Sequence, residues 1–203
     1  QMGEALGKEA KNNEVSVILG PGVNVKRNAL CGRNFEYFSE DPYLAGKLGA
    51  SFVRGVQKNG IGTSVKHFAL NNQEYKRFSS DSIADERTIR EIYLAPFERV
   101  IKEAKPDTVM CAYNKINGTY CSENKWLLTD VLREEWGFQG VVVTDWGAMN
   151  SKIESFKAGC DLSMPGGSAY MEKETVEAVK TGTLLETDID KSVLRILDLV
   201  QKK

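Results

Sequence analysis

The sequence predicts an α/β fold with a parallel sheet, of the (β/α)8 barrel type. Apolar, β-branched segments alternate along the chain with amphipathic helical segments, as in folds whose parallel strands are joined by helices. Polar residues gather directly after the predicted strands, which is where a barrel of this type builds its active site. No glycine-rich phosphate loop follows any strand, so a nucleotide-binding sheet is disfavoured.

The chain is short for a whole barrel. A complete one typically takes about 250 residues and eight strands, whereas these 203 residues contain five predicted strands. The opening segment QMGEALGKEA has a helical pattern and resembles neither an initiator methionine nor a leader peptide. We therefore expect residues 1–203 to form one partial barrel domain that lacks the first strands.

The first half of the chain predicts two strands with a helix between them. Residues 15–20 and 61–70 are apolar and rich in β-branched side chains, which is typical of buried parallel strands. Asp41 and Pro42 supply an N-cap and a first-turn proline, so a helix is predicted to begin there and to end before Gly60.

The second half of the chain predicts three more strands, at residues 107–114, 140–146 and, with a weaker pattern, 160–167. A helical pattern covers residues 85–104, and Pro96 inside it predicts a kink or a break. Thr187 is a candidate N-cap for the last helix. Further helices are predicted at residues 126–136, before residue 158, at 170–180 and at 187–200.

Composition excludes several classes of function. The formal net charge is -1, so no basic surface favours nucleic acid or an anionic membrane, and no apolar run approaches the ~20 residues of a membrane helix. Four cysteines without CxxC spacing and a single histidine disfavour a zinc site. We expect no metal and no organic cofactor, and these features leave the cellular compartment undecided.

Lys66 and His67 end the second predicted strand, and three interpretations of them stay open. They can be a surface lysine beside a hydrogen-bonded core histidine. Lys66 can form a Schiff base, as in aldolase-type barrels. Alternatively, the ammonium and the imidazole can donate together to the hydroxyls of a polyol. The loop at residues 31–42, which carries Arg33, is long for a strand-to-helix connection, and long loops are often functional.

Asp145 and Trp146 end the fourth predicted strand in the segment GVVVTDWGAMN. A carboxylate can act as a nucleophile, an indole can stack on the apolar face of a sugar, and arginine, lysine and histidine can donate to sugar hydroxyls. Together these residues predict a glycosidase site. Met110 and Tyr113 lie three residues apart on the third strand, so both reach one pocket only if that strand ends irregularly.

Four motifs resemble the N-terminal barrel domain of glycoside hydrolase family 3, especially its β-glucosidases, in order and in spacing. They are GPGVNVKRNALCGRNFEYFSEDP, SVKHFALNNQE, VMCAYNKING and GFQGVVVTDWGAMN. The segments AGCDLSMPGG and DIDKSVLRIL are similar to the end of that barrel. Two departures, Ala29 where proline is usual and Ser163 where glutamate is common, do not touch the expected chemistry.

The resemblance implies a retaining, exo-acting β-glycosidase that acts on a carbohydrate substrate, with Asp145 as the nucleophile. The family's acid/base glutamate comes from a following α/β sandwich domain, and a further sugar-binding aspartate comes from the first part of the barrel. We therefore expect this chain alone to be inactive, with Glu36 and Glu74 as poor substitutes for the acid/base. The implied sugar-binding positions are Arg33, Lys66, His67, Met110, Tyr113 and Trp146.

Several alternatives stay open beside a β-glucosidase. The chain can be a non-catalytic, sugar-binding barrel fragment, or it can have another activity of the family, such as that of a β-xylosidase. The β-N-acetylglucosaminidase branch is disfavoured because its motif continues into a loop with a second, catalytic histidine, whereas His67 is the only one here. Unpaired strand edges also predict association with the missing barrel and sandwich segments of the parent polypeptide, or self-association.

Overall fold

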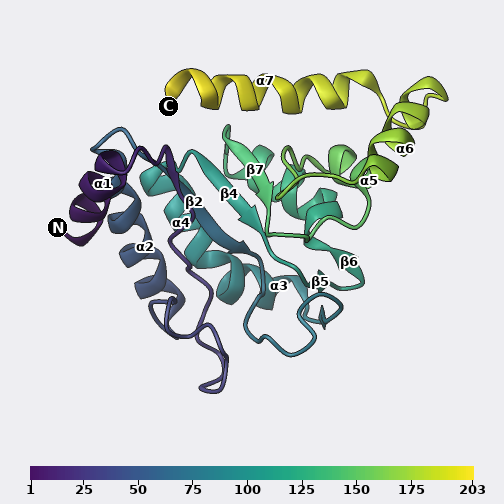
Figure 1. Ribbon diagram of the computed structural model, residues 1–203. Coiled ribbons are helices and arrows are strands. Elements are labelled where there is room, and N and C mark those ends of the chain that lie inside the picture. Colours follow the sequence, from purple (N-terminus) through teal and green to yellow (C-terminus); the bar gives the residue numbers. More distant parts are fainter.

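The computed structural model describes residues 1–203, and at its centre lies a four-stranded parallel sheet (Figure 1). The strands lie side by side in chain order, and helices connect them, which is the arrangement of part of a (β/α)8 barrel. The predicted fold class is therefore confirmed. The strands are β1 (Val17–Ile18), β2 (Gly62–Phe68), β4 (Thr108–Cys111) and β7 (Val141–Thr144).

Seven α-helices and three other helical segments surround this sheet. The other segments are π-helical at Ile89–Leu94 and Trp126–Glu135 and 3-10 helical at Cys121–Glu123. A second, small sheet, which the sequence pattern did not predict, consists of the two-residue strands β3 (Asp81–Ser82), β5 (Lys115–Ile116) and β6 (Thr119–Tyr120). The α-helices are α1 (Met2–Asn12), α2 (Pro42–Gln57), α3 (Glu86–Thr88), α4 (Ala95–Ala104), α5 (Lys152–Ala158), α6 (Ala169–Lys180) and α7 (Glu186–Lys202).

The predicted helix starts are confirmed at α2 but not at α7. Asp41 caps α2 by accepting a hydrogen bond from the Leu44 amide at 2.9 Å. Thr187 lies inside α7, which begins at Glu186 without a side-chain cap, so its prediction as the cap was wrong. Pro96 lies in the first turn of α4, directly after the π-helical segment, so the helical stretch 86–104 changes its hydrogen-bonding pattern at the proline instead of breaking there.

The predicted fifth strand, residues 160–167, was also wrong in extent. Only Leu162 pairs with the sheet, through a single parallel bridge to Val143. Pro165 has no N–H to donate to a ladder, and Gly166 has a φ of +132°, a conformation that a regular strand does not contain. The chain therefore leaves the sheet edge after one bridge.

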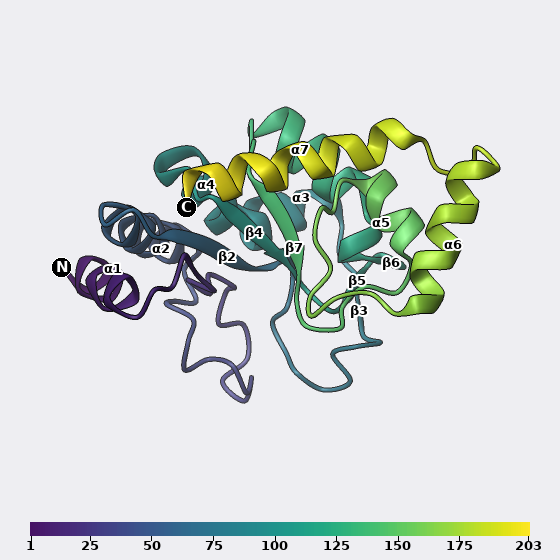
Figure 2. The same cartoon turned by 45° about the horizontal axis from the view of Figure 1, so that its top comes forward.

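The two faces of the sheet pack against different helices. Val65, Val109 and Val142 belong to the main core, which also holds side chains of α2, α4 and segment 126–135. The residues that alternate with them, such as Met110 and Val141, face the other side and pack against α7. In Figure 1 the yellow helix α7 lies above the sheet and α2 lies below it, and Figure 2 shows α7 running past β7.

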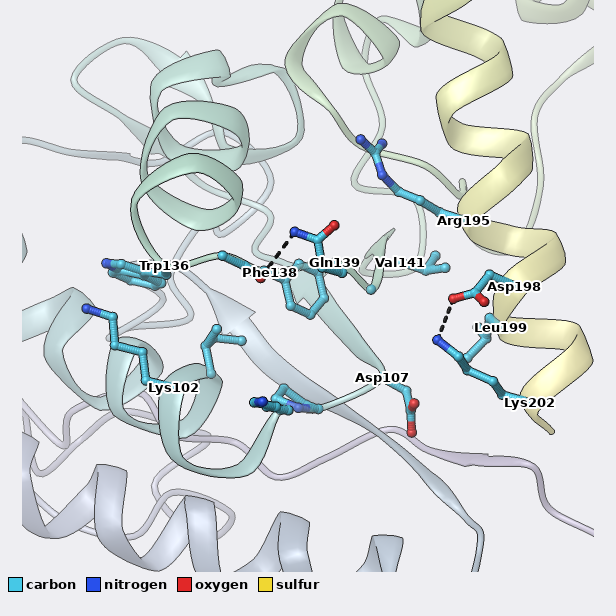
Figure 3. A pocket seen from close by; sticks show the side chains of 15 residues that line it. Lys102, Asp107, Trp136, Phe138, Gln139, Val141, Arg195, Asp198, Leu199 and Lys202 are labelled. Atoms are coloured by element: carbon cyan, nitrogen blue, oxygen red, sulfur yellow. Dashed lines mark hydrogen bonds and ion pairs between the residues drawn. The ribbon is translucent and has the colours of Figure 1, made fainter.

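A cavity of about 400 Å³ lies where β4 and β7 begin (Figure 3). The end of α4, residues 136–141 and α7 line it, with Lys102, Trp136 and Asp198 among the side chains drawn. In a barrel this N-terminal end of the strands serves stability, and the chemistry is built at the opposite end. No helix of the structure has the length and apolar character needed to cross a membrane.

Candidate active site

The ends of three neighbouring strands bring six of the seven predicted site residues together. Lys66 and His67 lie at the end of β2, Tyr113 lies just after β4, and Asp145 and Trp146 lie just after β7. Arg33 reaches the same place from the loop between β1 and α2, since its guanidinium lies 3.6 Å from the carboxylate of Asp145.

Met110 lies on β4 beside Val143, two residues before Asp145. Its side chain is buried in the small apolar cluster with Val141 and Val143, against α7. Tyr113 turns toward Trp146 and donates a hydrogen bond from its hydroxyl to the Trp146 carbonyl at 2.9 Å. The strand ends at Cys111, so the irregular end that both residues needed is present, and Tyr113 reaches the other polar site residues from it.

Asp145 holds one carboxylate oxygen in place and leaves the other free of hydrogen bonds. Its Oδ1 accepts a hydrogen bond from the Trp146 amide at 2.8 Å. Its Oδ2 is buried without a hydrogen-bond partner and faces Arg33 Nη1 at 3.6 Å and His67 Nε2 at 3.5 Å. A buried, unpartnered oxygen beside a cation is available to react with or bind a ligand.

Glu36 joins the two cations of the site. It is hydrogen-bonded to Arg33, and its other oxygen lies 3.2 Å from Lys66 Nζ. Burial alone would raise the pKa of the Glu36 carboxyl, but the hydrogen bond from Arg33 and the charge of Lys66 outweigh burial and lower it. Lys66 Nζ is engaged by Glu36, whereas a Schiff-base lysine must present an uncommitted amine to a carbonyl group, so the aldolase interpretation is disfavoured.

His67 is a neutral imidazole with a tightly held backbone. Asn24 accepts a hydrogen bond from the His67 amide at 2.7 Å and donates one to its carbonyl at 2.9 Å. Burial, together with the positive charges of Arg33, Lys66 and Arg77, lowers the pKa of His67 to about 2. Its Nε2 is buried without a hydrogen-bond partner, so this atom points into the site uncommitted.

The outer wall of the site is aromatic. The Arg77 guanidinium lies 4.5 Å from the centroid of the Tyr113 ring, and the Phe78 and Tyr113 rings are 4.4 Å apart. Trp146 remains 39% exposed, so part of this residue is accessible to a ligand. Burial, together with the negative charge of Asp145, raises the pKa of Tyr113 to about 12, which keeps its hydroxyl protonated.

The site contains equal numbers of positively and negatively charged side chains. Arg33, Lys66 and Arg77 are positive, and Glu36, Glu74 and Asp145 are negative; Glu74 accepts a 2.8 Å hydrogen bond from Arg77. Such a site suits an uncharged, hydroxyl-rich ligand better than an anion. No group of three or more histidine, cysteine, aspartate or glutamate side chains in the structure could hold a metal ion.

Sequence reasoning assigned no site role to four residues that build this site: Asn24, Glu36 in its bridging role, Tyr37 and Arg77. Three of them lie in the motif segments, but their contacts join residues up to 43 positions apart. The periodicity of side chains along a strand or helix does not predict contacts between residues so far apart in the sequence. Two pairs at a spacing of three residues, Arg33 with Glu36 and Glu74 with Arg77, are the contacts that spacing could have suggested.

The buried, neutral His67 makes the stability of the fold depend on pH. The unfolded state takes up a proton near pH 6.5 and the native state does not, so stability is fully present above that pH and is lost as the pH falls toward 2. We expect the free energy of unfolding to fall by about 1.4 kcal/mol between pH 7.5 and 5.5 through this group alone. Urea unfolding at both pH values measures it, with His67→Gln as the reference. If the free energy of unfolding of the wild type and of His67→Gln changed equally with pH, the assignment of His67 as a neutral imidazole would be contradicted.

Comparison with known proteins places this geometry in a family. The model of the "Glycosyl hydrolase family 3 N terminal domain" matches residues 1–199. The chain belongs to glycoside hydrolase family 3. This confirms the resemblance that the four motifs predicted.

Relatives and solved structures within glycoside hydrolase family 3 agree with the observed fold. Thermostable beta-glucosidase B of Acetivibrio thermocellus is 55% identical over 98% of this chain, and an exo-alpha-(1->6)-L-arabinopyranosidase of Bifidobacterium breve is 50% identical over 100% of it. The structure of beta-glucosidase 3B from Thermotoga neapolitana in complex with glucose matches 98% of this chain with a TM-score of 0.95 and 50% identity. This chain spans 26% of each of those two relatives and 29% of that structure.

Proposed function

We propose that this chain carries the nucleophile half of a retaining, exo-acting β-glycosidase, with a terminal β-glucosyl residue as the preferred substrate. The observation that carries the proposal is the free Oδ2 of Asp145, buried at the end of β7 and faced by Arg33 and His67. Beta-glucosidases among the relatives, and a neighbouring structure whose title names bound glucose, support the choice of sugar.

In the proposed reaction Asp145 Oδ2 forms a bond to the anomeric carbon as the bond from that carbon to the leaving-group oxygen breaks. Water then attacks the same carbon, and the Asp145 ester bond breaks, so the two inversions retain the configuration. Arg33, Lys66 and His67 donate to sugar hydroxyls, and Trp146 packs on the ring's apolar face. Met110, buried on the neighbouring strand β4, is a proposed apolar residue at the base of this set.

The second carboxyl group of a retaining enzyme must lie about 5–5.5 Å from the nucleophile and must arrive protonated. Glu36 does not suit that role, because Arg33 and Lys66 lower the pKa of its carboxyl and keep it charged. Glu74 is hydrogen-bonded to Arg77 and Asn71. We therefore assign the acid/base to a part of the parent protein beyond residues 1–203, and infer that these residues alone hydrolyse ordinary glycosides poorly.

Binding of D-glucose to the chain tests the sugar site without requiring the acid/base. In a titration followed by the ¹⁵N-labelled indole signals, we expect the signal of Trp146 to shift and the Arg33→Gln variant to bind about tenfold more weakly, since a charge-assisted hydrogen bond contributes about 1.5–3 kcal/mol. Arg87→Gln is the matched control, because Arg87 forms an exposed pair with Glu91 on the surface. Equal affinity of the wild type and Arg33→Gln, or no binding by the wild type, would overturn the proposed site.

A further inference from the structure

Tyr37 lies directly behind His67 and is locked in place. It is 3% exposed, and its hydroxyl lies 3.0 Å from His67 Nδ1, with the two rings in an edge-on arrangement 6.0 Å apart. A Cβ atom added at Gly22 would meet the Tyr37 ring at 2.8 Å, so the missing side chain of Gly22 makes the space for this ring. Gly22 is also bridged to Lys66 at the edge of the sheet.

The hydrogen bonds around Tyr37 indicate where its proton lies. A tyrosine hydroxyl donates one hydrogen and accepts through two lone pairs. Asn71 donates to this oxygen from Nδ2 at 3.2 Å, so an acceptor position is filled. The hydroxyl hydrogen then has two possible acceptors, His67 Nδ1 at 3.0 Å and the Asn71 carbonyl at 3.4 Å, and the histidine nitrogen is the nearer one.

The opposite edge of the imidazole favours the same arrangement. His67 Nε2 faces Asp145 Oδ2 at 3.5 Å, and an ionised carboxylate can only accept. A lone pair on Nε2 would be repelled there, whereas an N–H is attracted. A neutral imidazole has one N–H, so an accepting Nδ1 at Tyr37 and a donating Nε2 at Asp145 describe a single tautomer.

We propose that Tyr37 is a positioning residue that holds His67 in its Nε2–H tautomer, so that the ring presents a hydrogen-bond donor to the sugar beside Asp145. The role in sugar binding rests on the proposed function, whereas the tautomer itself rests on the contacts of Tyr37, His67 and Asp145 alone. Without the phenol, Nδ1 has no donor and the proton is free to move to it. Nε2 then becomes an acceptor and repels the carboxylate.

The single histidine of the chain allows a direct test. In ¹⁵N-histidine-labelled protein, long-range proton–nitrogen correlation spectra identify which ring nitrogen carries hydrogen. We expect the Nε2–H form in the wild type at pH 7 and a shift toward the Nδ1–H form in Tyr37→Phe, with D-glucose binding about tenfold weaker, as for loss of a buried donor. Tyr43→Phe, which removes an exposed hydroxyl on α2, is the control and keeps the wild-type spectrum.

The wild-type spectrum decides the tautomer even if Tyr37→Phe does not fold. An Nδ1–H form in the wild type would overturn the inference, and so would a folded Tyr37→Phe protein with an unchanged tautomer. A wild-type protein with the Nε2–H form that does not bind D-glucose would overturn the proposed function and leave the tautomer assignment standing. The two failures are therefore distinguishable.

Discussion

Replacement of Asp161 with asparagine is expected to lower the free energy of unfolding by about 3–5 kcal/mol. The Asp161 carboxylate is fully buried, and one oxygen accepts hydrogen bonds from Arg133 at 2.7 Å and from the Val142 amide at 2.8 Å. The other accepts from Ser192 at 3.0 Å and Arg195 at 2.8 Å. This one side chain therefore joins β7, segment 126–135 and α7.

The expected loss arises because the arginines remain when the charge is removed. The Arg133 side chain is 9% exposed, and burial lowers the pKa of its guanidinium although Asp161 favours the charged form. An asparagine of the same shape leaves that cation without a counter-charge and turns an NH₂ group toward one of the donors.

Denaturant unfolding of the Asp161→Asn protein measures this loss against a matched control. Asp130→Asn removes an aspartate from the same helical segment, but its partner Lys125 is 66% exposed, and such surface pairs contribute about 0–1 kcal/mol. Unfolding midpoints that coincide for the two variants would show that the Asp161 cluster does not hold α7 to the sheet.

The fold class could be predicted from the sequence because both faces of the parallel sheet are covered. Strand β7 has valines at three consecutive positions, Val141 on the α7 side and Val142 in the main core, and such runs are typical of strands buried on both faces. The two-residue strands of the small sheet are too short to have a period. At residues 160–167 a proline and a glycine end the pairing with the sheet, and this effect can be recognised only when the neighbouring strand is known.

The candidate site could be predicted only in part. Asp145 and His67 lie near the ends of predicted strands and Arg33 lies in the loop after one, and the barrel rule places such residues at one end of the sheet. Tyr37 and Asn24 could not be assigned, because each acts on His67 across 30 and 43 residues, and either could equally have been an ordinary loop residue. Asp161 was predicted only as part of a strand. Its place at the centre of a hydrogen-bonded cluster could not be predicted, because its four partners lie 19 to 34 residues away.

The proposed function depends on Asp145 as the glycosyl-accepting nucleophile. A 2-deoxy-2-fluoro-β-D-glucosyl donor with a dinitrophenolate leaving group tests it most directly, because that leaving group departs with little help from a general acid. The fluorine slows the water attack that would release the sugar, so the enzyme-bound ester accumulates. Intact-mass spectrometry of the folded chain, followed by peptide mapping, locates it.

We expect one sugar on each wild-type chain, attached to Asp145, and none on the Asp145→Asn variant, because an amide oxygen is a far weaker nucleophile than a carboxylate. Glu74→Gln, which changes a neighbouring carboxylate, is expected to label like the wild type. A folded wild-type chain that remains unlabelled, or one labelled on Glu36 or Glu74, would contradict the assignment of Asp145.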